Sequence, residues 1–196
     1  MNELRNVIET KQIIPVVFPA RTSDSIIVPA ARTFTWQTNI VSGIGKPRWI
    51  IVGFQVDKIE TQEQNPAVFD HLNLTGAQVI LNTEKYPQND ILITYSTNDY
   101  SVLYEMFDNF KKDYYGYNSL VGGTQVNFSA FKSLFPIIVF DVRRQSEKIK
   151  TGIADMRFKF TFSDVTPAGT MAYATIISDR KTKLKSDGKN LIMVDW

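Results

Sequence analysis

Residues 156–162 alternate strictly between apolar and polar side chains, and this alternation constrains the fold more than any other feature of the chain. One face would carry a methionine and three phenylalanines, and the other would carry Arg157, Lys159 and Thr161. Successive side chains of a strand point to opposite faces of its sheet, so the pattern predicts a strand with one face in a core and the other in water. Such half-wetted strands are typical of antiparallel sheets.

Apolar segments lie on both sides of this strand. Residues 137–142 precede it and residues 172–177, which are small or β-branched, follow it. The intervening KIKTG and TPAG sequences supply turn residues, since Gly152 and Gly169 can adopt positive φ. Residues 135–180 therefore predict three strands separated by two turns.

Earlier parts of the chain show the same kind of pattern in shorter pieces. Further strands are predicted at residues 13–18, 25–28, 33–38, 48–56, 77–82 and 91–95. Pro15 indicates that the first of these lies at a sheet edge or a bulge. Gly53 indicates either a bulge or a close backbone approach.

One segment, residues 98–115, has the periodicity of an amphipathic helix. Its apolar face would comprise Tyr100, Leu103, Tyr104, Phe107, Phe110 and Tyr114. Thr97 or Asn98 can cap its start, and Gly116 can adopt the left-handed conformation at its end. A single further helical turn is predicted near residues 129–134.

About eight strands with one inserted helix and no repeated βαβ pattern predict an all-β fold. The best specific prediction is an eight-stranded antiparallel jelly-roll sandwich with the helix inserted at about 98–115, and an immunoglobulin-like or other Greek-key sandwich is the open alternative. With 43% hydrophobic residues, the chain can build one sizeable core. We expect one domain over residues 13–196, preceded by an arm at residues 1–12.

Two connecting segments receive their own predictions. Residues 62–74, QEQNPAVFDHLNL, are too long for a tight hairpin and are predicted to be an ordered crossing between the two sheets. Residues 179–196 end in the apolar run LIMVDW, which could form an edge strand, dock on its own domain or reach a neighbouring molecule.

The residue types needed for catalysis or metal binding are scarce. The chain has no cysteine and one histidine, His71, so thiolate sites and multi-histidine metal sites cannot form, and His71 is interpreted as structural. The SGIGKP segment at residues 42–47 lacks the spacing of a phosphate loop. Paired carboxylates for acid–base chemistry could come from Asp141, Asp155, Asp164 or Asp179, but nothing in the sequence fixes two of them across a cleft. A set of strand-end charges is interpreted instead as pairing with one another or with a neighbouring subunit: Asp141, Arg143, Arg144, Glu147 and Lys148. We expect no enzymatic activity, no catalytic or metal-binding residues, no cofactor and no small-molecule substrate.

Charge places few constraints on partners. The 22 basic and 20 acidic residues nearly cancel, which argues against a surface-wide nucleic-acid or membrane binder. The DRKTKLK cluster at residues 179–185 is interpreted as a solvated surface, with contact to nucleic acid or an acidic partner as the alternative. We therefore expect nucleic-acid contact to be weak or indirect. The sequence has no secretory signal and no apolar stretch near the ~18 residues of a membrane span, so we expect an intracellular chain, in cytoplasm or nucleus, without a membrane partner.

Several collinear segments carry a family resemblance. They are PRWIIVGFQ (47–55), QNPAVFDHLNL (64–74), VILNTEKYP (79–87), FKKDYYG (110–116), FPIIVFDVRRQSEKIKTG (135–152) and PAGTMAYATIISDR (167–180). Together they resemble the hexon-like, double jelly-roll major capsid proteins of Polinton (Maverick) elements and adintoviruses. The match runs from residue 47 to the end of the sequence and corresponds to the carboxy-terminal of the two jelly rolls.

The resemblance implies a structural capsid protein located in the virion, in which two rolls stand side by side and three subunits form a pseudo-hexagonal capsomer. It implies self-association, with a trimer as the expected form, and no catalytic residues. Family members carry another roll upstream, so the chain is expected to be an excised carboxy-terminal domain, a processed copy or a single-roll protein that assembles differently.

A second class of function is compatible with the same fold. A jelly roll can act as a ligand-binding, carbohydrate-type module without catalysis, if exposed aromatic rings form a platform. The candidate rings are those of Trp36, Tyr86, Tyr115 and Tyr117. Defined oligomers without ligand would favour the capsid interpretation, and a monomer retained on glycans would favour the module.

Overall fold

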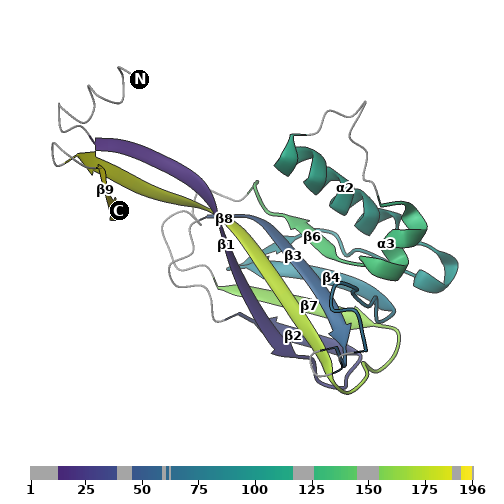
Figure 1. The fold of residues 1–196 in the computed structure, drawn as a ribbon. Coiled ribbons are helices and arrows are strands. Elements are labelled where there is room, and N and C mark those ends of the chain that lie inside the picture. The colour runs from purple at the N-terminus through teal and green to yellow at the C-terminus, as the bar shows by residue number, and fades with distance from the viewer. Residues whose placement is uncertain are drawn as a thin grey trace.

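A computed structural model describes residues 13–38, 46–58, 61, 63–116, 126–144, 155–186 and 191–195. The strands are β1 (Ile13–Ile27), β2 (Thr33–Gln37), β3 (Pro47–Val56), β4 (Leu74–Leu81), β5 (Glu84–Tyr86), β6 (Ile138–Asp141), β7 (Met156–Phe162), β8 (Thr170–Ser186) and β9 (Leu191–Asp195). The helices are the 3₁₀ turn η1 (Tyr95–Thr97), α2 (Ser101–Tyr115) and α3 (Phe128–Leu134). Figure 1 shows the strands as a sandwich with α2 and α3 on one side of it.

The sheet order is that of a jelly roll, as predicted. β1 pairs with β8, β2 with β7, β3 with β6 and β4 with β5, all antiparallel, as in one long hairpin. Rolling that hairpin up brings β3 against β8 and β4 against β7, which closes the sheets β1-β8-β3-β6 and β2-β7-β4-β5. Eight of the nine described strands make the roll, and the ninth, β9, pairs with β8 at one end.

The alternating strand that dominates the sequence lies at the centre of the core. Phe158 and Phe160 of β7 are fully buried, whereas Lys159 between them is exposed. The Phe160 ring lies 5.1 Å from that of Phe54 on β3, edge to face, and the Phe158 ring lies 5.1 Å from that of Trp36 on β2. These ring contacts across and within the sheets make burial of aromatic area the main stabilising force of the sandwich.

Two predicted short strands are one continuous strand. β1 runs from Ile13 to Ile27 without interruption, although the prediction separated residues 13–18 from residues 25–28. Pro15 and Pro19 are accommodated because β1 is the outermost strand of its sheet, where the missing amide hydrogen leaves no ladder partner unsatisfied. The expected edge position of Pro15 is therefore confirmed.

The predicted strand at residues 91–95 is wrong. Ile91, Ile93 and Tyr95 are buried and the intervening residues are exposed, so the alternation exists, but this segment joins neither sheet and contains only an isolated bridge from Thr94 to Asp99. The partner of β4 is instead β5, which lies in the turn-rich TEKYPQND connection and pairs over just Val79↔Tyr86 to Leu81↔Glu84. A period-two burial pattern reports which side chains face the core, and it does not specify a hydrogen-bonded neighbour.

The helix α2 packs on the outer face of the β1-β8-β3-β6 sheet, next to β6. Leu103, Phe107 and Phe110 are buried, as the periodicity predicted, and the ring of Phe110 lies 5.1 Å from that of Trp49 on β3. Gly116 ends the helix with φ +68°, also as predicted. The start was predicted wrongly, because Asn98 adopts φ +59° at the end of η1 and α2 begins after Tyr100 without a side-chain cap.

The predicted helical turn near residue 129 is the short helix α3. Asn127 caps it by accepting a hydrogen bond from the Ala130 amide at 2.7 Å. Several predictions fall on residues outside the described part of the chain: the arm at residues 1–12, the loop at 42–45, the ring of Tyr117 and the turn containing Gly152. The single-domain boundary at residues 13–196 remains a prediction.

Candidate interaction surfaces

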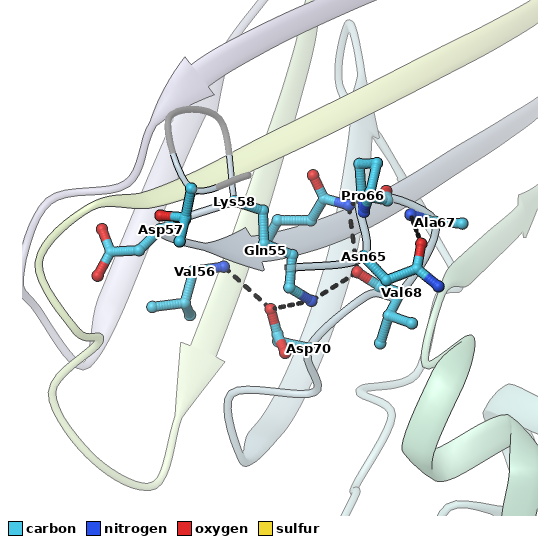
Figure 2. Close-up of polar contacts among 10 residues, drawn as sticks. Gln55, Val56, Asp57, Lys58, Asn65, Pro66, Ala67, Val68 and Asp70 are labelled. Atoms are coloured by element: carbon cyan, nitrogen blue, oxygen red, sulfur yellow. Dashed lines mark hydrogen bonds and ion pairs between the residues drawn. The ribbon is translucent and has the colours of Figure 1, made fainter. Parts of the chain in front are cut away.

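The crossing at residues 62–74 connects β3 of one sheet to β4 of the other, as predicted, and is held by a polar cluster at the end of β3 (Figure 2). Asp70 is at its centre. The Asp70 carboxylate accepts a hydrogen bond from the Val56 amide at 2.9 Å, and the same oxygen lies 2.9 Å from Nζ of Lys58. The Asp70 amide donates to the carbonyl of Phe54 at 2.8 Å. The crossing thus takes up backbone hydrogen bonds of the last residues of β3, beyond Val52, where the pairing of β3 with β6 ends.

Lys58 and Gln55 satisfy the carbonyl groups that the crossing exposes. Lys58 donates from Nζ to the Val68 carbonyl at 2.6 Å, and Gln55 donates from Nε2 to the Pro66 carbonyl at 2.7 Å and to that of Val68 at 3.2 Å. The Lys58 side chain is only 7% exposed. Because a buried ammonium needs a counter-charge and carbonyl acceptors, this cluster is built to fix the backbone.

Gly53 allows the crossing to approach the sheet. A Cβ atom added to Gly53 would lie 2.5 Å from Cδ1 of Phe69 in the crossing. Of the two roles predicted for this glycine, the bulge is wrong, since the β3–β8 ladder is regular at Gly53↔Tyr173. A close approach does exist, but the Phe69 side chain makes it and not, as predicted, a backbone.

The single histidine lies at the end of the crossing. Nδ1 of His71 accepts a hydrogen bond from the Asn73 amide at 3.0 Å, and the ring stacks on Tyr95 with centroids 4.3 Å apart. Burial, reinforced by the nearby Lys132 ammonium, lowers the pKa of His71 below its usual value. These contacts support the interpretation of His71 as a structural residue.

A cleft of about 740 Å³ opens beside His71, between the crossing and α3. Lys132 projects from α3 at this cleft and donates to the Tyr95 carbonyl at 2.8 Å and to Oδ1 of Asn98 at 2.9 Å. The rings of Tyr100 and Phe128 stack at 4.1 Å along its wall. The Lys132 ammonium is therefore engaged in holding α3 to η1.

Each carboxylate considered for acid–base chemistry has a structural partner. Asp141 pairs with Arg143, Asp155 with Arg157 and Asp179 with Arg48, and Asp164 accepts from the hydroxyl of Ser163 at 2.9 Å. Burial alone would raise the pKa of Asp141, but hydrogen bonds from Arg143 outweigh it and lower that pKa. The predicted ion-pair role is thus confirmed for Asp141 and Arg143, whereas Glu147 and Lys148 lie outside the described residues.

The rings proposed as a ligand platform do not assemble into one. Trp36 is 2% exposed and packs in the core, and the Tyr86 hydroxyl donates to Glu84 at 2.6 Å. Tyr115, at the end of α2, is 56% exposed but stacks edge to face on Tyr114. The described residues therefore offer one exposed candidate ring rather than a surface of several.

Sequence reasoning found the crossing but missed the polar cluster that holds it. A buried lysine was not expected at residue 58, since lysine is almost always exposed. The available signal was Asp70, a lone acid inside a segment of apolar residues. Among the described residues, no group of three potential metal ligands occurs, and none of the helices is long and apolar enough to cross a membrane.

The strand order places the chain among the jelly-roll proteins. A family model, the double jelly roll-like domain, matches residues 2–182, and the chain belongs to that family. The match starts well upstream of residue 47, so the similarity includes β1 and β2.

A solved structure of the Sputnik virophage, determined by cryo-electron microscopy, is similar to the chain with 15% sequence identity and a TM-score of 0.48. The similarity covers 93% of this chain and 38% of the virophage chain, so the chain spans well under half of that protein's length. A search of curated proteins found no match.

Proposed function

We propose that this chain is a structural capsid-type subunit that associates with copies of itself and performs no catalysis. The observation that carries the proposal is its membership of the double jelly roll-like family, in a chain whose β1–β8 form a complete roll. Polar side chains with structural partners support it, since Lys58 and Asp70 hold the crossing to β3 and Lys132 holds α3 to η1.

The proposal extends to the form of the assembly. By the resemblance to Polinton and adintovirus capsid proteins, the expected closed unit is a trimeric capsomer, and its location is the virion. Nucleic-acid contact would be weak or indirect in such an arrangement, because subunits meet mainly one another. Symmetric closure around a three-fold axis uses one pair of complementary surfaces repeated three times.

The helical layer and the crossing are the surfaces that we propose for these contacts. The helices carry four exposed apolar side chains: Val102 is 44% exposed, Tyr115 56%, Phe128 37% and Leu134 39%. The outer face of the other sheet, in contrast, presents polar residues of β2 and β7 to solvent. Interfaces between subunits bury apolar side chains at their centres, which favours the helical layer.

Sedimentation velocity over a concentration series tests the proposal. The expected result is a defined oligomer, a trimer by analogy, that forms without added ligand. The double variant Val102→Ser, Tyr115→Ser should dissociate it, whereas Leu92→Ser, Val165→Ser should not. Those two control residues are at least as exposed, 81% and 56%, but lie outside the helices.

Two outcomes would contradict the proposal. A chain that stays monomeric at every concentration and is retained on a glycan column would be a ligand-binding jelly roll instead. An oligomer that dissociates equally in both double variants would mean that the helical layer is not the contact surface.

A further inference from the structure

β1 and β8 are longer than the other strands of the roll, and their ends run out beyond the sandwich (Figure 1). We call this extension the ribbon: residues 13–19 of β1, residues 179–186 of β8, and β9. β3 pairs with β8 only as far as Pro47↔Ser178, and β9 pairs with the following part of β8, from Thr182 to Ser186. The ribbon is therefore a three-stranded sheet at its far end, without a second sheet packed on it.

The register of the ribbon places lysines between aliphatic side chains. Lys185 lies opposite Ile13 on one side and Ile192 on the other. Lys183 lies between Pro15 and Val194 in the same way. Because directly opposite residues of antiparallel strands share a face, these rows lie on one face of the ribbon.

A third row, Val17 opposite Lys181, completes this face. The rows repeat every two residues, so consecutive lysines are about 7 Å apart along β8.

The side chains of this face are accessible. Ile13 and Val17 are each 56% exposed, and Ile192 is 50% exposed. Lys181 and Lys185 are exposed as well, while the nearest acid on β8, Asp179, is neutralised by its ion pair with Arg48 at 2.7 Å. The face thus combines the exposed lysines Lys181 and Lys185 with aliphatic surface.

The opposite face of the ribbon is mixed and partly covered. Ile14 and Val16 of β1 and Leu184 of β8 lie on it and are half-buried, and Thr182 is only 2% exposed. Phe18, which lies opposite Arg180, is 38% exposed, and Met193 is 62% exposed. The lysine face is therefore the more accessible of the two.

We propose that the ribbon binds the surface of a lipid bilayer with anionic headgroups. Its aliphatic side chains would enter the boundary between headgroups and acyl chains, while the long lysine side chains reach outward to lipid phosphates and carboxylates. The sequence-based expectation of no membrane partner rested on the lack of a spanning segment, and surface binding requires none.

The positive charge of the ribbon lysines favours an anionic partner. The residues beside these lysines favour lipid over nucleic acid. Single-stranded nucleic acid is held by aromatic rings or arginines that stack on bases, interspersed with cations. The lysine face carries isoleucine, valine and proline instead, which cannot stack on bases but do partition into lipid. This inference does not depend on the proposed capsid role.

Vesicle flotation with the full chain tests it, using vesicles of phosphatidylcholine alone and of phosphatidylcholine mixed with phosphatidylserine. The expected result is binding to the mixed vesicles only, weakened as salt is raised above about 0.1 M. The double variant Lys181→Gln, Lys185→Gln should bind roughly 30-fold more weakly. The matched control Lys85→Gln, Lys159→Gln removes two equally exposed lysines elsewhere and should bind as the wild type does.

The apolar contribution has its own pair of variants. Val17→Ser, Ile192→Ser should reduce binding to mixed vesicles, and Val165→Ser, Leu92→Ser, at similar or greater exposure, should not. The proposal is overturned if the chain binds neither vesicle, or if both lysine pairs have equal effects. It is also overturned if the chain binds a single-stranded DNA oligonucleotide but no vesicle, or if the ribbon variants change only the oligomer mass.

Discussion

Replacing Gly53 by alanine tests how closely the crossing is fitted to the sheet. The new Cβ would lie 2.5 Å and 2.6 Å from two ring carbons of Phe69 and 3.3 Å from Cγ2 of Ile137. Carbon atoms in good contact are about 3.5 to 4.0 Å apart, so the ring must move by about 1 Å. That movement is resisted, because the Phe69 amide donates to the Leu134 carbonyl at 3.0 Å and the next residue, Asp70, is held in the polar cluster.

The magnitude follows from two opposing effects. Overpacking of this kind costs about 1 to 3 kcal/mol. Alanine also restricts the unfolded chain, which stabilises the fold by about 0.4 to 1 kcal/mol where the backbone conformation is compatible. We expect Gly53→Ala to lower the free energy of unfolding by about 0.5 to 2.5 kcal/mol, the difference between these effects.

Urea denaturation followed by tryptophan fluorescence measures this loss. Gly76→Ala, in strand β4, is the matched control. The Cβ added there would meet the Ile91 carbonyl oxygen at an ordinary 3.5 Å. In a double-mutant cycle, Phe69→Ala should remove most of the effect of Gly53→Ala, because the two groups are in direct contact. A Gly53→Ala protein as stable as the wild type, or a loss unchanged in the Phe69→Ala background, would refute this fit.

Three further predictions concern the helix, the histidine and metals. Phe107→Ala should destabilise the fold by about 3 to 5 kcal/mol, since the ring is buried between α2 and α3; an unchanged melting temperature would mean that α2 does not pack on the domain. Because the pKa of His71 is lowered in the folded chain, the unfolded chain takes up a proton first as the pH falls. The contribution of the neutral His71 ring to stability is therefore complete above about pH 6.5 and is lost at lower pH. Melting curves at several pH values should show this loss for the wild type and not for His71→Asn, and identical profiles would contradict it. Elemental analysis should find no stoichiometric metal, whereas one tightly held zinc or iron per chain would show that a site was missed.

The strands that alternate between core and solvent could be predicted from the sequence, because burial on one face leaves a local pattern. β7 and β3 were predicted to within a residue of their limits for this reason. The continuity of β1 could not be predicted, because it depends on pairing with β8 more than 140 residues later, from Ile13↔Lys185 to Ile27↔Met171. Pro15 suggested an interruption that an edge position makes unnecessary.

The polar features were predicted less well than the strands. Lysines at every second position of residues 181–185 are the pattern of a strand with one charged face, but the cluster was interpreted first as solvated surface. The aliphatic residues that flank these lysines come from residues 13–17 and 192–194, at the two ends of the sequence. Only the rolled pairing brings them together, so no local pattern could identify the face.

Self-association and lipid binding are assigned to different parts of the roll, and this separation makes a combined experiment informative. The helical layer covers the β3 and β6 side of its sheet, whereas the ribbon begins where β3 stops pairing with β8, at Ser178. Substitution of Lys181 and Lys185 should therefore weaken vesicle binding and leave the oligomer mass unchanged. Substitution of Val102 and Tyr115 should act directly on the oligomer mass. If dissociation of the oligomer also weakens vesicle binding, the reason would be multivalency: several ribbons on one assembly bind the same surface with a raised effective concentration, although each monomer makes the same contact.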